Sequence, residues 1–167
     1  ETALDVVFAE DADGEFDAVI LASGDRTQPL NTTTDNWIYM IKDRFTTTGA
    51  PPSNEDLLTH DDLADLTSNC LQGADLTSDN AFASCSDPET IEANLANGWK
   101  VKLGNCEALD SEGNVTTGAD CGEKGLATPL TIEGTVFFTS YLPLLPTAVA
   151  AGEPPESCGP REGSGLF

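Results

Sequence analysis

The amino-acid sequence predicts an all-β protein made of antiparallel strands. Short β-branched and aromatic runs recur along the chain, and two residue pairs that favour tight turns, Asp13-Gly14 and Glu133-Gly134, separate neighbouring runs. The 167 residues are enough for one domain with a sizeable core, and a hydrophobic fraction of 39% is typical of a folded protein.

The first three strands are expected at residues 4–9, 16–22 and 36–43. The runs LDVVFA and FDAVILA flank Asp13-Gly14, so they should form a hairpin. The third run, NWIYMIKD, is aromatic and β-branched and should lie beside them. Between the second and third runs, Ser23-Gly24 breaks an apolar strand abruptly, which predicts a corner in the chain.

Residues 46–97 have a different, more polar composition and are expected to form an insertion between strands. Two short helices are expected within it. Residues 53–66 offer Ser53 as a cap and an uneven apolar side. Residues 87–97 are the clearer case, because Asp87 can cap a helix that has Pro88 at its first position.

Strands return in GWKVKLG, residues 98–104. Apolar residues alternate there with Lys100 and Lys102, which predicts a half-buried or edge strand with both lysines pointing outward. Residues 104–122 should form a second, hairpin-like insertion. Two further strands are expected on either side of Glu133-Gly134, and the final GSGLF should begin another.

These strands make two antiparallel meanders of three or four strands each. Radial repetition of such meanders gives a β-propeller. The sequence therefore predicts about two propeller blades in one partial domain, residues 1–167, with 46–97 and 104–122 as insertions. Because a propeller needs roughly four to eight blades, we expect the chain to be a segment of a larger ring.

Five cysteines, none in a CxxC pair, and a single histidine make a zinc site a poor fit. The repeated spacing of 15 residues predicts disulfides Cys70–Cys85 and Cys106–Cys121, which leaves Cys158 unpaired within the chain. Such loops form in an oxidising compartment, so the expected location is secreted or at the cell surface. Buried free thiols are the alternative.

The net charge of −22 excludes classes of partner. Nucleic acid and anionic membrane surfaces both require clustered lysine and arginine, and this chain has only seven basic residues. No run approaches the ~20 apolar residues of a membrane span.

The sequence also lacks the signatures of common catalytic sites. There is no GxSxG elbow and no glycine-rich phosphate loop followed by lysine. His60, the only candidate base, lies in the polar run LLTHDDL and is expected to be a solvated surface residue. We therefore expect a protein that is not an enzyme.

Calcium is the one cofactor that the sequence suggests. The run DADGEFD supplies Asp11, Asp13 and Asp17 as hard oxygen ligands around Gly14. It is not a complete EF-hand loop, because the far end has no bidentate glutamate. A plain Asp-Gly hairpin with a solvated Asp17 is the alternative.

Several stretches together resemble a known family. ILASGDRTQPL with NWIYMIKD, then GWKVKL, then KGLATPLTIEGTVFFTSYLP and CGPREGSGLF are similar in order and spacing to the C-terminal propeller of type IV pilus biogenesis and tip-adhesin proteins of the PilC/PilY type. The resemblance covers about half of the chain, including both ends. It implies a β-propeller without catalytic residues, and calcium in some members.

The resemblance places Asp25 and Arg26 at a blade corner. Neighbouring side chains on an extended chain point in opposite directions, so these two should not pair with each other. Asp25 is expected to accept backbone N–H groups of the turn, and Arg26 to reach a carboxylate or carbonyls on the adjacent blade. A solvated surface pair is the alternative.

The sequence thus suggests an extracellular, non-catalytic binding or structural module from a type IV pilus tip adhesin or pilus-assembly protein. Its expected partners are minor pilins or other tip subunits, the rest of its own propeller, or a host or surface ligand, contacted through the insertions. Two alternatives remain: a calcium-dependent adhesive or structural β-module unrelated to pili, and a fragment of a quinoprotein-like propeller enzyme.

Overall fold

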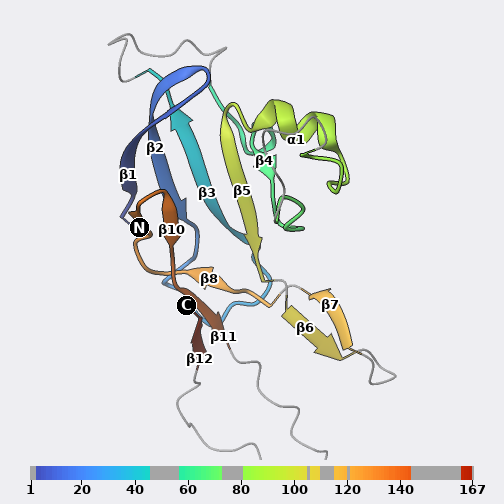
Figure 1. Cartoon of the computed structure of the whole chain (residues 1–167). Coiled ribbons are helices and arrows are strands. Elements are labelled where there is room, and N and C mark those ends of the chain that lie inside the picture. Colours follow the sequence, from blue (N-terminus) through green and yellow to red (C-terminus); the bar gives the residue numbers. More distant parts are fainter. Residues whose placement is uncertain are drawn as a thin grey trace, which may run out of the picture.

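The computed structural model describes residues 3–45, 57–72, 81–104, 106–109, 115–119, 121–143 and 163–166, the last strand and residues 106–109 and 115–119 by their backbone only. These residues form mostly short strands arranged in two layers (Figure 1). The expected all-β class is confirmed, with one short α-helix in the described part of the chain.

The principal sheet has five strands in the order β1-β2-β3-β5-β4. Its first three strands lie where the sequence predicts them. The bounds are β1 (Asp5–Asp11), β2 (Gly14–Ala22), β3 (Asn36–Asp43), β4 (Ala64–Asp65) and β5 (Gly98–Leu103). The neighbours from β1 to β5 are antiparallel, but the two-residue β4 pairs parallel to β5, so the sheet is mixed rather than purely antiparallel.

The β1–β2 hairpin forms as predicted, with its turn shifted by one residue. Ala12 and Asp13 connect the strands, and Gly14, at a φ of 114°, pairs with Asp11. At the start of β5, Gly98 is required by space, because a Cβ there would lie 2.0 Å from the Met40 carbonyl oxygen. Gly98 thus lets β5 approach β3 closely at this point.

The second layer consists of short strands from the C-terminal third of the chain. These are β8 (Lys124–Gly125), β9 (Leu130–Ile132), β10 (Thr135–Phe137), β11 (Ser140–Pro143) and β12 (Gly163–Leu166). The predicted turn between β9 and β10 is confirmed, since Glu133 and Gly134 both have positive φ, as in the turns that suit tight hairpins. Strands β8, β11 and β12 form a separate three-stranded sheet, of which β11 is the middle strand.

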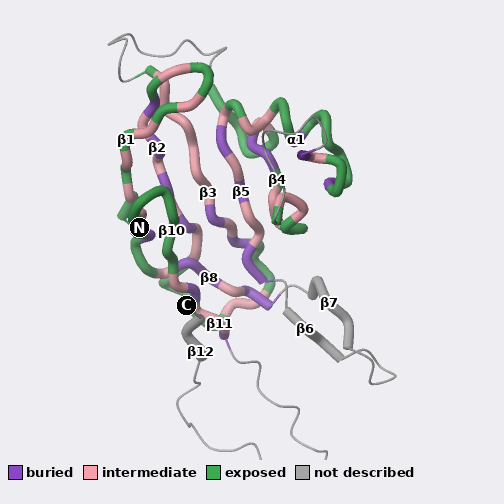
Figure 2. Tube along the Cα trace, viewed as in Figure 1, coloured by how far each residue is buried: buried purple, intermediate pink, exposed green. Residues whose placement is uncertain are grey.

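This second layer packs against part of one face of the principal sheet, here called the inner face. Phe16, Ala18 and Ile20 of β2 are buried on it, and Val136 of β10 packs against them. Gly125 lies so close to Ala22 that a Cβ on it would be 2.3 Å from the Ala22 Cβ. Buried segments consequently run along β2, β3 and β8, where the layers meet, and β5 also has buried segments (Figure 2).

The opposite face, here called the outer face, carries Val6, Val19, Leu21, Trp37, Tyr39 and Ile41, because side chains alternate along each strand. Residues 57–63 lie over its β3–β5 part. The part formed by β1, β2 and the end of β3, here called the uncovered half, is exposed at Val6 and Phe8 of β1, and beside β3 it is bordered by Leu57 and Leu58, which line a pocket together with Val19 and Ile41.

The insertion folds differently from the expectation for residues 53–66. A helix there is wrong for the described part, where a single 3-10 turn, η1 (His60–Asp62), is followed by β4. Asp62 accepts hydrogen bonds from the Thr59 backbone N and Oγ1, both at 2.7 Å, which closes the turn on itself, and Ala64 and Asp65 then pair with Trp99 and Lys100. Residues 53–56 lie outside the described residues.

The second predicted helix is confirmed as α1 (Pro88–Asn94). Asp87 caps it by accepting a hydrogen bond from the Thr90 backbone N at 3.3 Å. Ile91 is its buried residue and packs with Ala64 and Cys85. The 104–122 insertion contains the antiparallel pair β6 (Cys106–Leu109) and β7 (Val115–Ala119).

Candidate binding surface

The outer face has a covered half, over which residues 57–63 lie, and the uncovered half. In the covered half, His60 contacts three residues of β3 and β5. Its ring meets the Trp37 ring edge-on with centroids 4.7 Å apart, and its Nδ1 lies 3.2 Å from the Tyr39 hydroxyl. Lys100 Nζ donates to the His60 carbonyl at 2.8 Å and lies 5.5 Å from the Trp37 ring centroid. Burial raises the pKa of Tyr39.

These contacts correct two expectations from the sequence. Lys100 does not point into solvent: it is 6% exposed, because residues 57–63 lie over its strand. The sequence pattern suggested otherwise because β5 was expected at an edge or half buried, whereas it lies between β3 and β4. His60 is exposed, as expected, but its ring is held by two aromatic residues rather than solvated on all sides.

The uncovered half combines an apolar strip with an acidic end. Val6, Val19 and Ile41 face one another across β1, β2 and β3, and Phe8 lies beside them. Val6 is 55% and Phe8 63% exposed, which is high for large apolar side chains in the middle of a strand.

The acidic end of the outer face lies next to the hairpin turn. Glu10 is directly opposite Glu15, and Asp17 is directly opposite Asp43. Like charges in directly opposed positions destabilise a sheet. In the described part of the chain, no lysine, arginine or histidine forms an ion pair with these four carboxylates.

The structure does not bring the three proposed calcium ligands together. Asp11 pairs with Gly14 and therefore lies on the inner face, whereas Asp17 lies on the outer face. Asp13 is exposed in the turn and donates its backbone N–H to Asp11 Oδ1. Among the described residues, no group of three or more Asp, Glu, His or Cys is placed to hold a metal ion.

Asp11 is instead the acceptor of two cations. Its Oδ2 lies 2.7 Å from Lys42 Nζ and 2.6 Å from Arg44 Nη2. These hydrogen bonds, the larger effect coming from Arg44, hold the pKa of Asp11 well below its usual range. Both cations also lie near the Phe16 ring, at 5.2 and 5.0 Å from its centroid. The cluster ties the hairpin to the end of β3.

At the predicted corner, Asp25 and Arg26 act in separate contacts. Asp25 Oδ1 accepts from the Thr27 Oγ1 at 2.7 Å and from the Thr27 backbone N at 2.8 Å, which lowers its pKa. Arg26 donates to the Leu126 carbonyl, a hundred residues away in the sequence. Arg26 therefore joins the corner to the chain that follows β8.

The corner also contains a lysine that the sequence did not single out. Lys124 has no exposed surface, and its Nζ donates to the carbonyls of Asn31 and Gly122, the second at 2.7 Å. Burial lowers its pKa, and the nearby Asp25 charge opposes that effect. A single lysine in a glycine-rich stretch gives no periodic signal, so burial of this kind could not be inferred from the sequence.

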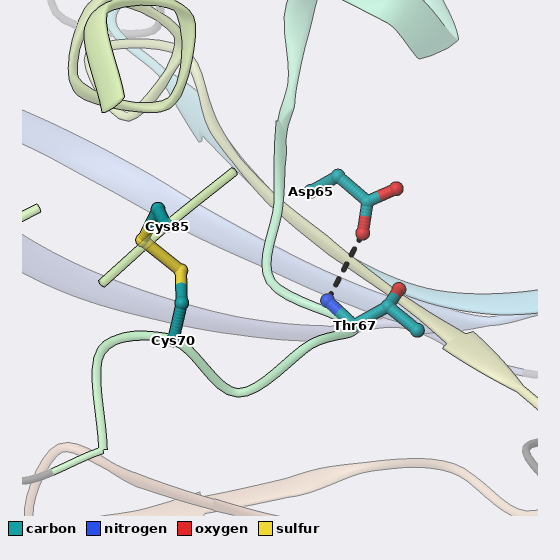
Figure 3. Close-up of a disulfide and its surroundings, with 4 residues drawn as sticks. All are labelled: Asp65, Thr67, Cys70 and Cys85. Carbon is teal, nitrogen blue, oxygen red and sulfur yellow. Dashed lines mark hydrogen bonds between the residues drawn. A yellow bond between two sulfur atoms is a disulfide. The ribbon is translucent and has the colours of Figure 1, made fainter. Parts of the chain in front are cut away.

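The predicted Cys70–Cys85 disulfide is confirmed (Figure 3). It joins the segment after β4 to the segment before α1, and in the same view Asp65 Oδ1 accepts a hydrogen bond from the Thr67 backbone N at 3.0 Å. Cys121 is also disulfide-bonded. The side chains of Cys106 and Cys158 lie outside the described residues, so Cys106–Cys121 stays a prediction.

Comparisons of the chain with protein-family models, curated proteins and solved structures find no match. No helix in the described ranges is long and apolar enough to cross a membrane. The arrangement of the outer face, with an apolar strip beside opposed carboxylates, is suited to contact with another molecule.

Proposed function

We propose that this chain is a non-catalytic, extracellular binding module, part of a β-propeller in a type IV pilus tip adhesin or pilus-assembly protein. The resemblance of its strand and corner segments to that family suggests the assignment. The Cys70–Cys85 disulfide is compatible with an oxidising, extracellular location.

One observation supports the propeller most directly, namely the stacking of a second antiparallel layer on the inner face. Blades of a propeller pack face to face in this manner. Arg26 with Leu126 joins two of the segments that resemble the family, and Lys124 with Asn31, the residue that follows the first of them, is a second tie between the layers. The antiparallel run β1-β2-β3-β5 has the four strands that a blade requires.

Binding to pilus components tests the function. The purified chain should bind minor pilins or intact type IV pili saturably in biolayer interferometry, and should not bind purified flagella. Absence of pilus binding under conditions in which circular dichroism shows a folded chain would contradict the assignment to pili.

A further inference from the structure

The uncovered half of the outer face has the features of a specific docking surface. Exposed apolar patches on a soluble protein mark interaction sites when they are contiguous and bordered by polar groups. Here Val6, Val19 and Ile41 form a continuous row across three strands, with the exposed Phe8 beside it.

A pocket deepens this surface beside β3. It has a volume of about 270 Å³, and its apolar walls come from strands β2 and β3 and from the start of the 57–72 segment. The apolar lining residues are Val19, Ile41, Phe45, Leu57 and Leu58. Lys42 also lines it, but its ammonium group is bound to Asp11. A pocket of this size fits one aliphatic or aromatic side chain.

The carboxylates beside the apolar row indicate the chemistry of the groups that should flank an apolar side chain in the pocket. The opposed pair Asp17–Asp43 borders the apolar row, and the opposed pair Glu10–Glu15 follows it toward the hairpin turn. Each pair costs stability that a cation between the two carboxylates would recover. A second copy of this chain would bring a further net charge of −22 against this end of the face, and self-repulsion opposes that contact.

We propose that the uncovered outer face of β1, β2 and β3 binds an extended segment of a separate partner protein, in which an apolar side chain enters the pocket and flanking lysine or arginine side chains meet the four carboxylates. This inference rests on the proposed binding function and adds the surface and the chemistry of the partner.

A labelled peptide in which valine alternates with lysine is the probe. We expect saturable binding by fluorescence anisotropy, and much weaker binding of valine–glutamate and serine–lysine peptides. Phe8→Ser should weaken binding by about fivefold or more, whereas Phe137→Ser, a change at a similarly exposed phenylalanine of β10, should leave it unchanged. Equal binding of the serine–lysine peptide, or equal losses in the two variants, would overturn the proposal.

A double substitution that removes two negative charges tests the acidic end separately. Glu10→Gln with Glu15→Gln should weaken binding and flatten its dependence on salt, whereas Glu89→Gln with Glu92→Gln on α1 should not. If sedimentation shows a dimer that Phe8→Ser separates, the occupant is a second copy and the proposal is wrong. Peptide binding without pilus binding would refute only the assignment to pili, and pilus binding that Phe8→Ser leaves intact would refute only this surface.

Discussion

Asp11 shows how one carboxylate joins three parts of the sheet. It accepts hydrogen bonds from Lys42 of β3, from Arg44 immediately after β3, and from the Asp13 backbone N–H of its own turn. Asp11→Asn keeps the shape but removes the charge, and we expect it to lower the free energy of unfolding by about 1–2 kcal/mol at neutral pH.

The pH dependence of this effect follows from the lowered pKa. A carboxyl whose pKa is lower in the folded state stabilises the fold above its ordinary value of 3.8 and loses that contribution as pH falls toward the lowered value. Urea denaturation of both proteins should therefore show a difference at neutral pH that shrinks below about pH 4. A difference that is constant with pH would mean that the charge has no role.

Lys124 should affect the free energy of unfolding at alkaline pH. Burial lowers its pKa below the ordinary value of 10.5, so the folded protein releases this proton at a lower pH than the unfolded chain does. Between the two pKa values the unfolded chain holds more protons, and stability rises with pH. Compared with Lys124→Met, the wild type should therefore gain stability as pH approaches 10.5 in urea denaturation. Parallel pH profiles of the two proteins would contradict this.

Residue-level prediction succeeded where the signal is local. Asp87 before Pro88 specifies a cap through its own side chain, and Glu133-Gly134 specifies a turn through its backbone preferences. It failed for Lys100 and was incomplete for His60, because their surroundings depend on where residues 57–63 lie. The alternation of apolar and polar residues in β5 does not indicate that residues 57–63 lie over that strand.

At the scale of elements, long strands were predictable and short ones were not. The run from Asn36 to Asp43 has β-branched and aromatic residues along it, and β3 has these bounds. The two-residue β4 is too short for any alternation and owes its place to pairing with β5. Of the leucines in 57–66 that suggested a helix, Leu57 and Leu58 line the pocket and Leu63 is buried directly after η1. Leu66 packs on the cluster of Ala64, Cys85 and Ile91.

The contact between the layers can be tested at β8. Gly125→Ala places a methyl group against Ala22, and such overpacking should cost about 1–3 kcal/mol in urea denaturation. Ala22→Gly creates the space that the methyl group needs. The double variant should therefore be more stable than the sum of the two single effects. Additive losses would mean that β8 does not pack on β2 in solution.

At the scale of the whole molecule, the sequence indicated layers of antiparallel strands but not how they are arranged. Apolar alternation shows that β2 and β3 have a face to bury, yet it does not say which later strands cover it. That depends on contacts such as Asn36 Nδ2 to the Glu123 carbonyl at 2.8 Å and Thr131 N to Asp5 Oδ2 at 2.6 Å. Contacts between residues so far apart in the sequence carry no local signal.

The charge of the whole chain gives a prediction about salt. The chain has 29 acidic and seven basic residues. Only three ion pairs join the described residues to one another, and two of them involve Asp11. Most carboxylates therefore repel one another, so sodium chloride should raise the melting temperature until the screening length falls to about 10 Å, near 0.1 M. A melting temperature that falls with salt would show instead that attractive pairs dominate.

Calcium chloride at matched ionic strength separates screening from specific binding. Because Asp11 and Asp17 lie on opposite faces and Asp11 already holds two cations, calcium should raise the melting temperature no more than sodium does after correction for ionic strength. Asp13→Ala should respond to both salts as the wild type does. An additional rise with calcium that Asp13→Ala abolishes would establish a calcium site at the hairpin turn, in conflict with the separation of its ligands across the sheet.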